Sequence, residues 1–112
     1  MEELAYFDEY PSPVTVCDTD GIILYINKKA AKDFTKWGGL DLIGKNLYDC
    51  HKPSSNEKIK EIIATGLANT YTIEKNGVKK LIHQAPWYKN GTISGLIEIS
   101  IILPNDMPSF NR

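Results

Sequence analysis

The sequence lacks a charge excess of either sign, and it lacks any long apolar run. It has 13 Lys and Arg residues against 14 Asp and Glu, a formal net charge of -1 over 112 residues. This balance provides no electrostatic footprint for DNA, RNA or an anionic membrane, so we expect neither nucleic acid nor a membrane as a direct partner. No apolar stretch approaches the roughly 20 residues that span a bilayer, and the acidic start "MEELAYFDEY" is unlike a signal peptide. We therefore expect a cytoplasmic protein.

Cysteine is also scarce. Cys17 and Cys50 lie far apart in the chain, so a disulfide framework is not expected and reduced thiols are the default. With 42% hydrophobic residues the chain can instead bury a core of its own. The length and composition predict one compact domain.

Three pairs of an acidic or amide residue with glycine predict the tight turns of an antiparallel sheet. They are Asp20-Gly21, Asn76-Gly77 and Asn90-Gly91, and each is flanked by β-branched or aromatic residues. Tight hairpin turns require positive φ angles, which these residue types tolerate best. The pattern predicts five strands, over residues 14–18, 22–26, 71–75, 78–87 and 92–103.

The region between the second and third strands has helical spacing. Asn27 is placed to cap a short helix whose apolar residues are Ala30, Ala31, Phe34 and Trp37. Further along, Ser54 with Glu57 three residues later matches a capping box, and Pro53 precedes it. Ile59, Ile62 and Ile63 lie on one face of this second helix, which we expect to end at Gly66.

The two ends of the chain differ from the middle. Leu4, Phe7 and Tyr10 form an apolar stripe, which predicts an amphipathic helix over residues 1–10 that packs on the sheet or on a second copy of the chain. Residues 104–112 contain two prolines and little periodicity, so we expect a flexible tail. The predicted globular domain is residues 11–103.

Two-residue turns also predict the register of the last three strands. Lys75 then faces Val78, and Lys89 faces Thr92. Counting outwards, Tyr71 opposes Ile82, which opposes Ile99, and His83 opposes Glu98. One face is then nearly all apolar, with Tyr71, Ile73, Ile82, Ile97, Ile99 and Ile101.

Several segments, taken in order, resemble the PAS family of sensory domains. "VCDTDGIILYINKKAAKDF" is similar to the family's opening hairpin and first helix, "DLIGKNL" to its short turn, and "APWYKNGTISGLIEISIIL" to its last hairpin. The resemblance covers about residues 11 to 103. It implies an α+β, PAS-like (profilin-like) fold: a five-stranded antiparallel sheet with helices on one face, plus the short N-terminal helix. It also implies a sensory module rather than an enzyme, a homodimer with the N-terminal helix as its dimer or output element, and an effector domain or separate signalling protein as partner.

In this architecture a small ligand would lie between the sheet and the helices. The resemblance then places the pocket among apolar helical residues and polar residues near its mouth or on the sheet: Trp37, Leu47, Cys50, His51, Ile59, Ile62, Ile63, His83 and Glu98. The same apolar residues can equally form a filled core, in which case the domain is a ligand-free dimerisation module. His83 and Glu98 can likewise be an ordinary cross-strand pair on the solvent side.

The residues also bear on cofactors and on catalysis. Gly44-Lys45-Asn46 is followed by Leu47, whereas photoactive flavin members of the family have a cysteine there, so flavin is not expected. The second helix has no histidine for heme, which leaves only His51 or His83 as axial ligands. Adjacent side chains at Cys50 and His51 point apart and make a poor zinc chelate. A thiol enzyme would need Cys50 as nucleophile with His51 or His83 as base.

Overall fold

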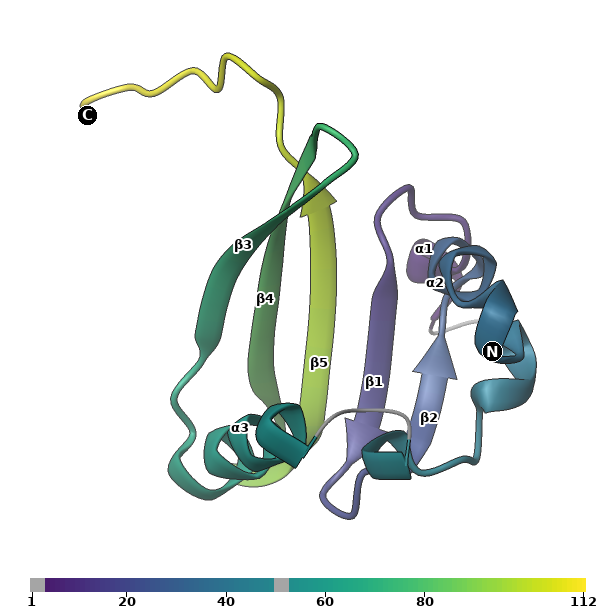
Figure 1. The fold of residues 1–112 in the computed structure, drawn as a ribbon. Coiled ribbons are helices and arrows are strands. Elements are labelled where there is room, and N and C mark those ends of the chain that lie inside the picture. Colours follow the sequence, from purple (N-terminus) through teal and green to yellow (C-terminus); the bar gives the residue numbers. More distant parts are fainter. Residues whose placement is uncertain (1–3, 50–52) are drawn as a thin grey trace.

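The computed structural model describes residues 4–49 and 53–112. Cys50 and His51 lie outside the described residues. The chain forms five strands with helices before, between and beside them (Figure 1). The elements in chain order are α1 (Ala5–Asp8), β1 (Val14–Asp18), β2 (Ile23–Ile26), α2 (Lys28–Asp33), the 3-10 helices η2 (Thr35–Trp37), η3 (Gly39–Leu42) and η4 (Leu47–Asp49), α3 (Pro53–Thr65), β3 (Asn69–Lys75), β4 (Val78–Lys89) and β5 (Thr92–Ile102).

All five strands form one antiparallel sheet. Their spatial order is β2-β1-β5-β4-β3, so the first hairpin and the last three strands meet where β1 pairs with β5. Figure 1 shows α2 beside β2 at one side of the sheet and α3 in front of β4 and β5 at the other. The predicted α+β class with a five-stranded antiparallel sheet is confirmed.

The turn chemistry explains why the strands end where they do. Asn76 and Asn90 adopt φ angles of 52° and 51°, and the glycine after each has a positive φ as well. The pairs Lys75 with Val78 and Lys89 with Thr92 form as predicted, and so does Tyr71 with Ile82. A two-residue turn with positive φ at both positions matches the right-handed twist of its strands.

The predicted register between β4 and β5 is wrong beyond the turn. The ladder shifts by one residue between Trp87 and Tyr88, so Ile82 opposes Ser100 and His83 opposes Ile99. Glu98 opposes Gln84 instead of His83. A β-bulge adds one residue to one strand, and because side chains alternate across a sheet, one residue is enough to exchange the faces.

The bulge therefore divides the predicted apolar face between two sides of the sheet. Ile82 and Gln84 lie with Leu96 and Glu98 on the side of the helices. Alternation along the strand places His83 on the opposite side, with Ile97, Ile99 and Ile101. We call this second side the outer face.

A prediction about the second helix is also corrected. Helix α3 begins at Pro53, so Ser54 lies inside its first turn and is not the capping residue. Proline suits the first helical position, because its missing N–H would have no partner inside the helix. The predicted end is confirmed: Gly66 has a φ of 77°, and its N–H donates to the Ile62 carbonyl at 2.8 Å.

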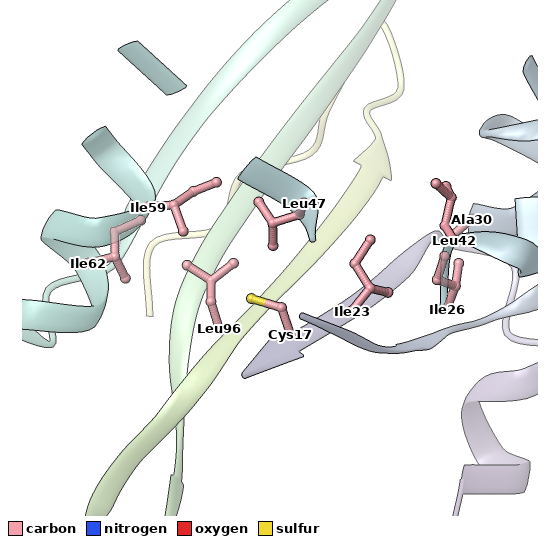
Figure 2. Close-up of a cluster of buried hydrophobic side chains, with 9 residues drawn as sticks. All are labelled: Cys17, Ile23, Ile26, Ala30, Leu42, Leu47, Ile59, Ile62 and Leu96. Atoms are coloured by element: carbon pink, nitrogen blue, oxygen red, sulfur yellow. The ribbon is translucent and has the colours of Figure 1, made fainter. Parts of the chain in front are cut away.

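The core lies between the sheet and the helices (Figure 2). Cys17 and Leu96 come from the sheet centre, Ile23 and Ile26 from β2, and Ile59 and Ile62 from α3. The cluster is completed by residues of the connecting helices, Ala30, Leu42 and Leu47. The residues described include no helix with both the length and the apolar character needed to cross a membrane.

Within the described residues, the N-terminal helix ends at Asp8, two residues before the predicted end. A hydrogen bond of 2.6 Å from the Tyr25 hydroxyl to the Asp8 carboxylate connects α1 to strand β2. The Tyr6 side chain is 87% exposed, and Phe7 and Tyr10 are partly exposed while their rings meet edge to face. The helix thus presents aromatic surface to solvent.

Candidate ligand cavity

A cavity of about 190 Å³ lies between the sheet and the connecting helices. Its walls come from three parts of the chain: the sheet strands β2, β1, β5 and β4, the segment from α2 to η4, and the first turns of α3. The lining residues are Thr15, Cys17, Ile23, Ile26, Phe34, Trp37, Leu42, Leu47, Ile59, Gln84, Leu96 and Glu98. The β-bulge takes part indirectly, because it turns Gln84 and Glu98 towards this side.

Most of the cavity wall is apolar. In Figure 2 the side chains of Leu47, Ile59 and Leu96 lie around one region, with Cys17 and Ile23 next to it. Trp37 also lines the cavity, and 57% of its surface is exposed, so we place it at the mouth. Apolar walls with an exposed aromatic residue at the mouth favour an organic molecule over a hydrated ion.

The polar groups are confined to one edge, where β1, β5 and β4 lie side by side. Glu98 lies between Thr15 on β1 and Gln84 on β4. The Gln84 amide nitrogen donates to Glu98 Oε1 at 2.8 Å, and Asn69 on β3 donates to Gln84 Oε1 at 3.0 Å. Burial, and secondly the Glu98 charge, raise the pKa of Tyr71 on strand β3 above its ordinary value.

The cavity collects some of the residues predicted for a ligand pocket. Trp37, Leu47, Ile59 and Glu98 line it. Ile63 packs against the hydrophobic cluster without lining the cavity, and Ile62 is buried inside the cluster. His83 lies on the outer face, where its Nδ1 is 2.8 Å from the Thr70 hydroxyl.

Two polar residues of the cavity, Thr15 and Gln84, were missed in the sequence. Gln84 is 7% exposed, and buried amides normally require partners, as it has in Asn69 and Glu98. The available signal is its position on β4 two residues after the buried Ile82, which places both side chains on the same face of the strand. A register without the bulge would place Gln84 on the side of the sheet opposite to Glu98.

The thiol in the cavity is unsuited to catalysis. Cys17 is 1% exposed, and burial raises its pKa to about 11. At neutral pH it is therefore protonated, whereas a nucleophilic cysteine works as the thiolate. We interpret Cys17 as part of the apolar wall.

Comparison with known proteins agrees with this geometry. A family model described as the PAS fold matches residues 7–101. No curated protein matches the sequence. Many solved structures do match, several of them at sequence identities of only 17 to 19%.

Three of the matching structures, all from Vibrio cholerae, illustrate the similarity. A complex of VqmA with ligand and DNA has 18% identity and a TM-score of 0.72, over 91% of this chain and 50% of that chain. The Aer2 receptor, described as a dual PAS-heme oxygen sensor, has 19% identity and a TM-score of 0.65, over 83% and 95%. A sensory box sensor histidine kinase has 17% identity and a TM-score of 0.63, over 92% and 88%. The chain thus spans about half the length of VqmA.

Proposed function

Because this chain belongs to the PAS family of sensory and signalling domains, we propose that it binds a small organic ligand in the cavity between sheet and helices. Ligand binding would bias the position of the terminal segments, which carry the signal to a second copy or an effector. The structures of similar fold include a VqmA complex described with a ligand and DNA and a receptor described as a dual PAS-heme oxygen sensor, and both descriptions support a small-molecule role. A cavity of about 190 Å³ favours a ligand of about one ring over a macrocycle such as heme.

The single observation that supports this proposal best is the uneven lining of the cavity. A core filled only for stability has no need of a carboxylate beside its apolar residues, because even partial removal of a charge from water, as at the part-buried Glu98, costs free energy. Here Glu98 lies on the cavity wall with one hydrogen-bond donor, Gln84, among the described residues. A polar edge on an otherwise apolar cavity is typical of ligand sites.

The second candidate function is a ligand-free dimerisation module, and the outer face favours it. Ile97, Ile99 and Ile101 lie on the same face of β5, and Ile101 is 40% exposed. The exposed aromatic residues of α1 lie at the edge of the same sheet, next to β2. Burying this surface against a second copy would stabilise a homodimer.

One experiment tests both candidates: native mass spectrometry of the freshly purified chain, which measures bound mass and oligomeric state together. We expect a dimer that carries a small additional mass. Ile59→Phe places a ring in the cavity and should remove the bound mass while leaving the dimer. Ile99→Phe, the matched control on the outer face, should keep the bound mass.

Two results would contradict the ligand proposal. A spectrum without bound mass under gentle conditions, together with a dimer, would favour the dimerisation module. A bound mass that survives in Ile59→Phe but is lost in Ile99→Phe would place the ligand on the outer face. A monomer at high micromolar concentration would exclude the proposed dimer.

A further inference from the structure

We propose that the cavity selects small, mainly apolar molecules that carry a protonated amine or a comparably strong hydrogen-bond donor, and that it rejects carboxylates. This inference rests on the proposed function, since it names the chemistry of the ligand for the same cavity. It depends on the direction of the hydrogen bonds around Glu98, on the charges nearby and on the size of the apolar part.

The direction of the hydrogen bonds follows from the carboxylate. An ionised Glu98 can only accept, so the Gln84 atom 2.8 Å from it has to be the amide nitrogen. The Gln84 oxygen then faces Asn69, and it accepts from the Asn69 amide nitrogen at 3.0 Å. Each end of the Gln84 amide thereby has one partner within the protein. The Glu98 carboxylate keeps unused acceptor capacity, and a ligand has to supply the donor.

The charged residues near the cavity also favour a cationic ligand over a carboxylate. Among the described residues that line it, none is a lysine, an arginine or a histidine. In the part of the chain described, the ion pairs join Lys28 with Glu9, Lys29 with Asp33, and Lys58 with Glu61, so none of them uses Glu98. His83, the nearest candidate cation in the predicted register, lies on the outer face. A cationic ligand would therefore provide a counter-charge that residues 4–49 and 53–112 do not place there, whereas a carboxylate would meet a like charge.

The volume sets the size of the apolar part. An apolar cavity of about 150 Å³ is known to hold a benzene molecule. The cavity of about 190 Å³ leaves room for such a ring and about one or two further atoms. Leu47, Ile59 and Leu96 would contact the ring, while Thr15 and Glu98 face the polar substituent. The chemistry that fits best is thus one ring with a short amine.

The test compares three probes of one shape: benzylamine, toluene and benzoate, measured by isothermal titration calorimetry at neutral pH. We expect benzylamine to bind at least ten-fold more tightly than toluene and benzoate not to bind, since a hydrogen bond to a charged group strengthens binding by about that factor or more. Glu98→Gln should lower the affinity for benzylamine by about ten-fold or more and leave toluene unchanged. Glu74→Gln, which removes an exposed carboxylate from β3, should change neither.

The outcomes separate this inference from the proposed function. If toluene and benzylamine bind equally, or if Glu98→Gln leaves the affinity for benzylamine unchanged, the cavity binds ligands but does not select donors. Preferential binding of benzoate would overturn the inference outright. If none of the three probes binds, the inference fails, and the bound mass in native mass spectrometry decides the ligand function separately.

Discussion

Gly95→Ala is expected to lower the free energy of unfolding by about 3 to 5 kcal/mol, as a clash of this kind adds to a lost hydrogen bond. A methyl group at Gly95 would overlap the Cys17 carbonyl oxygen and come within 2.5 Å of the Trp87 indole nitrogen. These two atoms now form a hydrogen bond of 2.9 Å, which joins β4 to β1 across β5. The bulge and this hydrogen bond occupy the same place, so the variant also disturbs the register that turns Glu98 towards the cavity.

Urea denaturation followed by tryptophan fluorescence measures this change. Gly44→Ala is the matched control, because Gly44 also has a positive φ, of 91°, but has open space around the added methyl group. Gly44→Ala should lower the free energy of unfolding only by the cost of the backbone strain, about 1 to 2 kcal/mol. Equal losses for the two variants would show that the crowding at Gly95 is not significant. If Gly95→Ala does not fold, Trp87→Phe tests the same hydrogen bond without the clash.

Asn27→Ala is expected to cost about 3 to 4 kcal/mol, which is roughly one lost helix cap and one or two buried groups left without partners. Asn27 is 0% exposed. Its side-chain oxygen accepts from the N–H groups of Val14 and Ala30 at 3.0 Å each, and its amide nitrogen donates to the Ser12 carbonyl at 2.8 Å. One side chain thereby joins the start of β1, the end of β2 and the start of α2.

The neighbouring residue provides the control for Asn27. Lys28 is exposed, and its Nζ lies 3.7 Å from Glu9 in a surface ion pair, so Lys28→Ala should change stability by less than about 0.5 kcal/mol. Asn27→Asp separates the roles of the side chain, since it can accept both hydrogen bonds but cannot donate to Ser12. It should therefore also destabilise the fold. Thermal or urea unfolding in which Asn27→Ala resembles Lys28→Ala would contradict this account.

The sequence predicts the fold well because its signals are local. Turns at Asn76 and Asn90, the cap at Asn27 and the helix end at Gly66 each depend on a few neighbouring residues, and the structure confirms all four. The helix cap at Ser54 failed for a reason that is also local: a proline at the first helical position competes with a capping box one residue later.

The polar edge of the cavity is harder to predict from the sequence, because it depends on the β-bulge between Trp87 and Tyr88. The bulge near Trp87 coincides with a hydrogen bond from the Trp87 indole to the Cys17 carbonyl, 70 residues away in the sequence, over Gly95. No pattern within β4 or β5 reports such a contact. With an unbroken register, His83 takes the place of Gln84 beside Glu98, and the predicted site gains an imidazole that the described cavity lining lacks.

The most direct test of the central claim is an NMR titration of the protein with labelled isoleucine and leucine methyl groups, using benzylamine as the ligand. If the cavity is the ligand site, the methyl signals of Ile23, Ile59 and Leu96 should shift with one common affinity. The methyl signals of Ile97, Ile99 and Ile101 on the outer face provide an internal control and should shift little. Shifts confined to the outer face, or the absence of any shift at saturating benzylamine, would contradict ligand binding between the sheet and the helices.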